Sequence, residues 1–444
     1  MTDTLPSLRT AIEKRSVAVG VIGLGYVGLP AACVIAEAGF KVTGIDIDAK
    51  RVEMINSGHS PIEGDEPGLA SLLTRVIDSK HLHASTSHTE LAKADIVLIC
   101  VDTPVEADHK PRFAALKSAC QSLGAVLKQG ALVIVESTIA PGTIDTIVRP
   151  ALESATGGMA GERFHLGHCP ERVMPGKLLR NMRTMNRVCG GSSPEVADAM
   201  VALYSTYVEG ELDPTDCLTA ELVKTAENAY RDVSIAFANQ LAVICEVVGG
   251  DVWRVRELVN KVPGRYVLLP GGGVGGHCIP KDSWLLATPL GAAAEDSLLG
   301  VARRVNDGMP GHVADLVGEL ADAKSHAKVT VLGYSYLENS DDTRNSASAA
   351  LKAILEQRGY EVTAHDPFVH EYAGDVMEAL SGADCAVLMV AHSAYRELDL
   401  RAAASKMKRA QMVDARALFK LEDLTAAGFE CRTIGVGLRT VVPS

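Results

Sequence analysis

The chain has 444 residues, of which 47% are hydrophobic and 22% are charged. This balance is typical of a globular protein and excludes a disordered tail or a fibrous repeat. At about 150 residues per domain, the length corresponds to roughly three domains. The 55 acidic residues exceed the 43 basic ones by 12. The net charge therefore repels polyanions and argues against nucleic acid as a partner.

The sequence shows no sign of an export or membrane segment. The longest apolar stretches, such as residues 95–101, fall far below the roughly 18 residues that span a bilayer. Residues 1–15 carry charges where a signal peptide would be apolar, and residues 441–444 form no lipidation motif. We therefore expect a cytoplasmic protein without a membrane partner. The ten cysteines are too sparse for a disulfide scaffold and form no CxxC pair, so no metal site is predicted.

The first part of the chain predicts a parallel sheet. Short β-branched runs alternate with a glycine turn at 23–28 and an apolar helix at 29–38, which is the pattern of a βαβ unit. Pro or Ser/Thr turns follow the later runs, which indicates parallel strands with helices on both faces. The expected strands are 17–22, 41–45, 96–101 and 131–135. We assign this domain to residues 1–210.

A long helix is expected next, over residues 219–248. Gly249 and Gly250 follow it directly and form a typical stop signal. At about 1.5 Å per residue the helix would span roughly 45 Å, which is enough to link domains or to pair two subunits. We assign residues 211–312 to a central helical domain.

The alternation of strands and helices then restarts and predicts a second doubly wound domain over residues 313–444. The expected strands are 328–332, 361–364, 385–390, 411–413 and 432–436, with a helix at 347–358. The predicted fold is therefore α/β, with two doubly wound Rossmann-like domains joined by a central helical region that contains one long helix.

The glycine turn carries a dinucleotide fingerprint. Gly23, Gly25 and Gly28 follow a strand and open a helix, so the backbone can approach a pyrophosphate at the helix N-terminus. Asp46 lies eighteen residues beyond Gly28, where a carboxylate accepts hydrogen bonds from a ribose and repels a 2′-phosphate. This favours NAD over NADP. The cations Lys50 and Arg51 weaken that choice, and a purely structural turn is the alternative reading.

A second unusual segment is GGGVGGHCIPKD at Gly271–Asp282. Its glycines let backbone and ligand approach the thiol of Cys278, and the ammonium of nearby Lys281 favours a thiolate. Taken alone, a structural turn with an incidental cysteine fits as well.

Polar residues elsewhere are candidates to act with this thiol. Lys224 and Asn228 stand four residues apart on the long helix and share one face, where they could orient an oxyanion. A solvated helix face is the alternative. Glu171 could be a general base or part of a surface turn.

Several long motifs in this order resemble the UDP-glucose/GDP-mannose dehydrogenase family, and within it the branch that oxidises UDP-N-acetylhexosamines. The match covers nearly the whole chain. The motifs are GLGYVGLP at 23–30, DTP at 102–104, ESTIAPGT at 136–143, CPERVMPG at 169–176, ENAYRDVSIAFANQLA at 227–242, GVGGHCIPKD at 273–282 and DDTRNS at 341–346.

The resemblance implies a four-electron oxidation of a sugar's primary alcohol to a carboxylate, with two NAD reduced. Cys278 is then the nucleophile that forms a thiohemiacetal and a thioester, and Lys224 and Asn228 stabilise its oxyanions. Asp282 holds or activates water beside Thr138, and Glu171 is the base in thioester hydrolysis.

The resemblance also implies which residues bind ligands. Arg265 resembles the family arginine that reaches the substrate of a neighbouring subunit, which would make a homodimer the smallest functional unit. The cofactor residues are Gly23, Gly25, Tyr26, Val27, Gly28, Asp46, Arg51, Thr103, Thr138 and Arg344. The substrate residues are Glu171, Arg172, Lys224, Asn228, Arg265, Tyr266 and Gly275.

One departure bears on the substrate. Leu337 and Glu338 stand where many members carry a lysine, so a substrate-phosphate contact is either missing or supplied by Arg344. The GGHC form of the cysteine loop and the CPERVMPG motif favour UDP-N-acetylmannosamine, followed by UDP-N-acetylglucosamine and then UDP-glucose.

Two rivals from other classes remain open at this point. A two-electron hydroxyacid dehydrogenase shares the fingerprint but needs no cysteine, and a sensor would bind the same ligands without turnover. His365, Asp366 and His392 at strand ends of the last domain are interpreted as ordinary loop residues, with a contact from Asp366 to uridine as the alternative.

Overall fold

The computed structural model describes residues 4–62, 66–174, 176–323 and 326–438. They form two compact units, one that runs up to Glu227 and includes Trp284–Pro289, and one of Asn228–Ser283 with the described residues from Leu290 onward. The division by function into residues 1–210, 211–312 and 313–444 stays a prediction. Within the described residues, no helix is both long enough and apolar enough to cross a bilayer.

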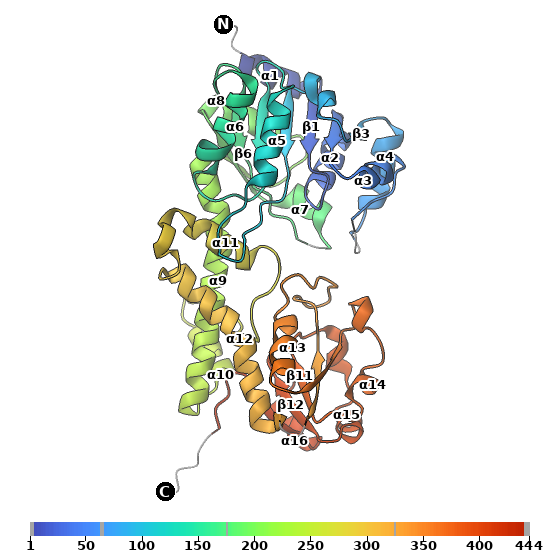
Figure 1. Cartoon of the computed structure of the whole chain (residues 1–444), viewed down its shortest axis with the longest axis vertical. Coiled ribbons are helices and arrows are strands. Elements are labelled where there is room, and N and C mark those ends of the chain that lie inside the picture. Colours follow the sequence, from blue (N-terminus) through green and yellow to red (C-terminus); the bar gives the residue numbers. More distant parts are fainter. Residues whose placement is uncertain (1–3, 63–65, 175, 324–325, 439–444) are drawn as a thin grey trace. The chain divides into compact units, whose positions relative to one another are not determined.

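The first unit is built on an eight-stranded sheet in the order β3-β2-β1-β4-β5-β6-β7-β8 (Figure 1). Its strands pair in parallel, as predicted, except that β6 and β7 are antiparallel. All residues of β4 and β5 are buried, which explains why these strands read as unbroken apolar runs. The strands are β1 (Ala18–Ile22), β2 (Lys41–Ile45), β3 (Leu82–Ser85), β4 (Ile96–Ile99), β5 (Leu132–Val135), β6 (His165–His168), β7 (Arg187–Gly191) and β8 (Leu212–Asp216).

Helices cover both faces of this sheet and bury two separate hydrophobic cores. One core joins the sheet to α1, α2, α3, α4, α7 and α8, and the other joins it to α5 and α6. The doubly wound arrangement is therefore confirmed. The helices are α1 (Thr4–Glu13), α2 (Gly28–Glu37), α3 (Ala49–Asn56), α4 (Leu69–Asp78), α5 (Ala114–Gly124), α6 (Arg149–Thr156), α7 (Leu178–Thr184) and α8 (Pro194–Tyr204).

The long helix is α9 (Cys217–Val248), with 32 residues. It begins two residues earlier than predicted and ends at the predicted stop. Gly249 adopts a φ of 73°, and the Gly250 N–H donates to the carbonyl of Cys245 at 2.7 Å. This left-handed turn satisfies a carbonyl that the last turn of the helix would leave unpaired.

The second unit holds a five-stranded parallel sheet in the order β10-β9-β11-β12-β13 (Figure 1). This confirms the second doubly wound sheet, with cores on both faces. The strands are β9 (Lys328–Leu332), β10 (Glu361–His365), β11 (Cys385–Leu388), β12 (Gln411–Asp414) and β13 (Glu430–Thr433). The helices after α9 are α10 (Val252–Val259), α11 (Ile279–Ala287), α12 (Leu298–Leu320), α13 (Ala347–Gln357), α14 (Val376–Leu380), α15 (Leu400–Lys406) and α16 (Leu421–Ala426).

Both sheets begin with the same turn. Gly23 follows β1 and Gly333 follows β9, each with a φ of 89°. Each glycine donates its N–H, at 2.8 Å, to the last carbonyl of the neighbouring strand, which belongs to Ile45 in one sheet and to His365 in the other. Positive φ at this point favours glycine, so the same kind of glycine turn follows the first strand of each sheet.

Candidate functional site

The fingerprint turn in the first unit is open on one side and closed on the other. A Cβ on Gly23 would lie 2.6 Å from the carbonyl oxygen of Cys100, and one on Gly28 would lie 1.8 Å from that of Gly23. A Cβ on Gly25 would meet nothing within 4 Å. The outer glycines therefore serve close packing, while Gly25 leaves the backbone accessible to a phosphate at the start of α2. These residues fit a dinucleotide. Packing alone does not require a glycine at position 25, so a purely structural role does not explain the whole turn.

Asp46 directly follows β2, beside this turn. Its Oδ2 accepts a hydrogen bond from the Leu24 N–H at 2.8 Å, and its Oδ1 accepts one from the Asp48 N–H at 3.0 Å. The guanidinium of Arg51 lies 3.0 Å from Oδ2. Arg51, which the sequence left open as a partner for a 2′-phosphate, is thus paired with the carboxylate that favours NAD.

Other predicted cofactor residues lie at the same edge of the sheet. The hydroxyl of Tyr26 donates to Glu66 at 2.5 Å, and Val27 immediately precedes α2. The hydroxyl of buried Thr103 donates to the carbonyl of Thr138 at 2.5 Å. The structure therefore brings Thr103 and Thr138 together where β4 and β5 end, because parallel strands deliver their carboxyl ends to one edge.

Glu171 lies in a buried charged cluster that the sequence analysis missed. Its side chain is buried, and its Oε2 lies 2.6 Å from Nη2 of Arg187. Oε1 accepts a hydrogen bond from the Arg172 N–H at 2.7 Å. The surface-turn reading of Glu171 is therefore wrong.

Arg187 also faces Glu136 at 3.8 Å and lies over the ring of Tyr204. The Tyr204 hydroxyl donates to Glu136 at 2.6 Å. The carboxyl groups of Glu136 and Glu171 thus share the guanidinium of Arg187. Burial raises the pKa of Glu136 to about 7. Arg187 begins β7 in an ordinary strand pattern, and only its charge within a buried strand could have marked it.

Arg172, a predicted substrate residue, is held from two sides. Its guanidinium pairs with Glu227 and donates to the carbonyl of Asn186 at 2.5 Å. Glu227 belongs to α9 and lies between Lys224 and Asn228 in the sequence. The pair fixes Arg172 to the same stretch of helix that carries those two residues.

The polar pair on α9 is not a solvated face. Lys224 is 8% exposed, and Asn228 donates from Nδ2 to Oδ2 of Asp282 at 2.6 Å. The other carboxylate oxygen of Asp282 has no hydrogen-bond partner among the described residues, although the Lys281 ammonium lies 3.7 Å away. The solvated-face alternative is therefore wrong, and Asp282 keeps one oxygen able to accept a hydrogen bond.

Cys278 is exposed and immediately precedes α11, whose first turn contains Asp282. The Asp282 N–H donates to the carbonyl of Cys278 at 2.8 Å. An exposed thiol one helical turn from a buried carboxylate that Asn228 holds is an arrangement for chemistry on a bound ligand.

The loop after β9 supports the glycines ahead of Cys278. The Gly276 N–H donates to the carbonyl of Arg344 at 2.9 Å, and Asn345 donates to the carbonyl of Gly276 at 3.1 Å. A Cβ on Gly275 would lie 2.6 Å from that of Tyr336. Arg344 thus lies beside the cysteine loop, and its guanidinium is paired with Asp342 at 2.6 Å.

Leu337 and Glu338, which stand where many family members carry a lysine, lie in the loop after β9. Leu337 is half exposed, and the Glu338 carboxylate lies 3.4 Å from the guanidinium of Arg416.

Arg265 and Tyr266 lie on the exposed loop after α10. The side chain of Tyr266 is exposed, with 73% of the residue accessible to solvent.

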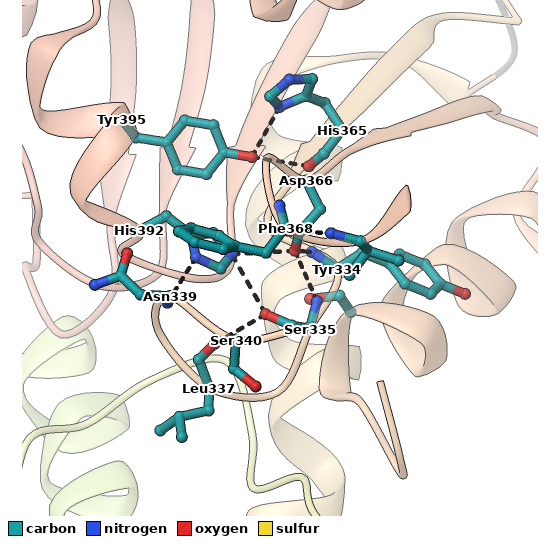
Figure 2. A network of polar contacts seen from close by, with 12 residues as sticks. Tyr334, Ser335, Leu337, Asn339, Ser340, His365, Asp366, Phe368, His392 and Tyr395 are labelled. Carbon is teal, nitrogen blue, oxygen red and sulfur yellow. Dashed lines mark hydrogen bonds and ion pairs between the residues drawn. The ribbon is translucent and has the colours of Figure 1, made fainter. Parts of the chain in front are cut away.

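The ordinary-loop interpretation of His365, Asp366 and His392 is wrong, because all three are buried. Figure 2 shows Asp366 at the centre of a polar network. It accepts hydrogen bonds from the backbone of Tyr334, Ser335, Phe368 and Val369 at 2.6 to 3.2 Å, and lies 3.0 Å from Nε2 of His392. The other ring nitrogen of His392 accepts the Asn339 N–H at 2.9 Å.

Comparison with known proteins identifies the family. Residues 17–208, 218–308 and 330–421 match, in order, the NAD binding, central and UDP binding domains of the UDP-glucose/GDP-mannose dehydrogenase family. The chain belongs to this family. It is an NAD-dependent oxidoreductase, a nucleotide-sugar 6-dehydrogenase.

Relatives within the family match along nearly the whole chain. The UDP-N-acetyl-D-mannosamine dehydrogenase of Methanocaldococcus jannaschii is 36% identical over 439 residues, which are 96% of this chain and 99% of the relative. The NDP-N-acetyl-D-galactosaminuronic acid dehydrogenase of Ralstonia nicotianae is 35% identical, with 94% and 99% covered. The solved UDP-D-ManNAc dehydrogenase of Pyrococcus horikoshii superposes with a TM-score of 0.88 at 35% identity, covering 95% of this chain and 99% of that one.

Proposed function

We propose that this dehydrogenase oxidises the primary alcohol of a UDP-N-acetylhexosamine, first of all UDP-N-acetyl-D-mannosamine, to the uronate. The names of relatives that span nearly the whole chain support this substrate class. UDP-N-acetylglucosamine and UDP-glucose are the alternatives. One observation carries the mechanism, namely the exposed thiol of Cys278 one helical turn from the carboxylate that Asn228 holds.

The thiol of Cys278 lets one enzyme remove four electrons. NAD, which the glycine turn and Asp46 would hold, would supply the hydride acceptor for two successive oxidations. Between them, the sulfur adds to the aldehyde carbon and forms a thiohemiacetal, whose oxidation leaves a thioester. Water then cleaves the carbon–sulfur bond, which releases the carboxylate and regenerates the thiol. The balance is one sugar nucleotide, two NAD⁺ and one water consumed, and one uronate, two NADH and three protons formed.

Residues of α9 and α11 stabilise the charges that develop. The ammonium of Lys224 and the second N–H of the Asn228 amide suit an oxyanion on the reacting carbon. Asp282 offers Oδ1 as an acceptor for water, and Thr138 is the proposed hydroxyl partner from the first unit.

Glu171 is the proposed base for thioester hydrolysis. Its Oε2 lies 2.6 Å from Nη2 of Arg187, which fixes the carboxylate in place. A carboxylate that is buried and held in this way can accept a proton from water without first losing a hydration shell.

We further propose a division of labour along the chain. Residues 1–210 bind NAD through Asp46 and the glycine turn, residues 211–312 carry the cysteine loop, and residues 313–444 bind the UDP moiety. In this division, Gly275, Arg172 and Arg344 contact the substrate or the cofactor.

A homodimer is the proposed functional unit, with Arg265 and Tyr266 reaching the substrate of the partner. Its support is an apolar line on α9, where Tyr230, Phe237 and Ile244 recur every seven residues and are 75%, 59% and 48% exposed. Aromatic and aliphatic side chains at this spacing are typical of a helix that pairs with another helix. The cytoplasmic location and a role in supplying uronates for polysaccharide synthesis stay predictions.

A panel of sugar nucleotides tests the proposal. The purified enzyme is mixed with NAD and UDP-N-acetylmannosamine, UDP-N-acetylglucosamine, UDP-glucose or GDP-mannose, and NADH is counted per sugar consumed. We expect two NADH per sugar, with UDP-N-acetylmannosamine the fastest. One NADH per sugar would favour a two-electron hydroxyacid dehydrogenase. No NADH formation with any of the sugars would support a sensor.

A further inference from the structure

The polar face of α9 continues beyond the two residues that the mechanism uses. Asp232 lies four residues after Asn228, and Asn239 lies eleven after it, so all three share one side of the helix over about three turns. Asp232 and Asn239 are fully buried. Buried polar side chains on a helix require partners, and both find them in or around the segment that carries Cys278.

Asp232 holds the end of this segment. Its Oδ2 accepts a hydrogen bond from the Ser283 hydroxyl at 2.7 Å, and Ser283 directly follows Asp282. Its Oδ1 pairs with Arg303 at 2.7 Å and accepts a hydrogen bond from Asn306 at 2.7 Å. Arg303 is itself 2% exposed, so the charge of Asp232 is balanced inside the protein.

Asn239 holds the start of the same segment. Its Oδ1 accepts the N–H of Gly271 at 2.9 Å, and its Nδ2 donates to Oδ1 of Asn306 at 2.9 Å. Asn306 therefore links the two anchors, because it contacts both Asn239 and Asp232. Figure 1 shows α11 and α12, which carry Ser283 and Asn306, beside α9.

Anchors matter here because the intervening backbone has little rigidity of its own. Five of the six residues at 271–276 are glycines, which lose the most conformational freedom on ordering. Regular structure resumes only at Ile279, where α11 begins. A thiol on such a segment takes its position from the contacts that fix the two ends, together with the loop after β9 that holds Gly276.

We propose that Asp232 and Asn239 are positioning residues, which hold both ends of residues 271–283 and thereby place Cys278 for addition to the aldehyde. This inference rests on the proposed thiohemiacetal chemistry. A misplacement of about 1 Å can cost on the order of a hundredfold in rate. When the sulfur is displaced, the first oxidation proceeds but the aldehyde escapes before the thiol adds to it.

The test compares Asn239→Leu and Ser283→Ala with the wild type. Asn239→Leu removes the acceptor for Gly271, and Ser283→Ala removes one hydroxyl and leaves the fold with minimal change. The readouts are NADH formed per sugar consumed and aldehyde captured as an oxime by hydroxylamine. Gln240→Leu is the matched control, because Gln240 is the exposed neighbour on the same helix.

We expect the wild type and Gln240→Leu to form two NADH per sugar with no oxime. Asn239→Leu should lower kcat for full oxidation at least tenfold and Ser283→Ala about threefold, both with a ratio that falls toward one and with oxime formed. The KM for NAD should stay unchanged. A stoichiometric ratio does not depend on how much enzyme is active, so a loss of folded protein cannot mimic this result.

Two outcomes would overturn the inference. Either both variants match the wild type, or they are slower but still form two NADH per sugar without oxime. Should Asn239→Leu fail to fold, Ser283→Ala decides alone. A wild type that itself forms one NADH per sugar would instead refute the proposed function.

Discussion

The two sheets place an aspartate at the same point and surround it differently. Asp46 follows β2 and accepts the N–H of Leu24, which follows Gly23. Asp366 follows β10 and accepts the N–H of Tyr334, which follows Gly333. In each unit, a carboxylate closes the turn that leaves the first strand.

The remaining partners differ. Asp46 is paired with Arg51, whose side chain is 37% exposed, and the open backbone at Gly25 lies in the same turn. Asp366 is paired with His392, and both side chains are fully buried. An exposed arginine can yield to a ligand, whereas a buried histidine cannot without loss of the local structure. The same turn is thus open to the proposed cofactor in the first unit, whereas in the second it fixes the loop of residues 334–340 (Figure 2).

The largest effect is expected from Asp366→Ala. It leaves four backbone N–H groups and a buried His392 without their acceptor, and removing one partner of such a buried pair costs about 3–5 kcal/mol. The unfolding midpoint of the full chain in denaturant measures the loss. NAD affinity, measured below that midpoint, should stay unchanged. A midpoint within error of the wild type would remove the structural role of Asp366.

Asp46→Ala is the matched change in the first unit. Loss of the proposed ribose contacts should raise the KM for NAD about 10- to 100-fold, or about 1.4–2.8 kcal/mol, and leave the KM for the sugar nucleotide nearly unchanged. Stability should fall by only about 1–2 kcal/mol, since fewer buried donors lose their acceptor. Unchanged NAD dependence in steady-state kinetics would show that the fingerprint was misassigned.

Acid should separate the two regions. Burial lowers the pKa of His168 on β6 from 6.5 to about 4, so the unfolded chain binds a proton that the folded chain excludes. Stability therefore falls as pH drops from 6.5 toward 4, by about 1 kcal/mol between pH 7 and 5.5.

Asp366 also loses its contribution to stability as the pH falls, but in stronger acid than His168. Burial by itself would raise its pKa, but hydrogen bonds from His392 and the backbone hold that pKa below the ordinary value. Its contribution is present above the unfolded pKa of about 3.9 and is lost only in stronger acid. His168→Phe should flatten the dependence of unfolding free energy on pH between 7 and 5.5, with Asp366→Ala as the control that does not. An identical slope in His168→Phe and the wild type would contradict this assignment.

The smallest effect is expected from Arg51→Ala. A half-exposed ion pair contributes less than about 1 kcal/mol, so stability should barely change. The preference for NAD over NADP should also persist, because Asp46 remains to repel a 2′-phosphate. A selective loss of NADP turnover in this variant would show that Arg51 binds that phosphate instead.

The sequence predicted most of the fold because apolar periodicity and glycine turns are local signals. The strands at 41–45 and 328–332 were predicted to the residue. The antiparallel pairing of β6 with β7 was not, because strand direction depends on how the intervening chain returns.

Site residues were also predictable only where the signal was local in the sequence. Cys278 and the glycines stood out by local spacing. Arg187 and the network around Asp366 did not, because their partners come from distant segments. Asp232 and Asn239 could have been found by extending the spacing of Lys224 and Asn228 along the helix.

The covalent step on Cys278 can be measured directly. Glu171→Gln enzyme is mixed with NAD and UDP-N-acetylmannosamine, quenched in acid within one turnover, and its intact mass and peptides are determined. Loss of the proposed base should let the thioester accumulate, so the account predicts a uronyl-nucleotide adduct on the peptide that carries Cys278 and none in Glu171→Gln/Cys278→Ser. Full conversion to the uronate by Cys278→Ser alone, with no adduct in either protein, would contradict it.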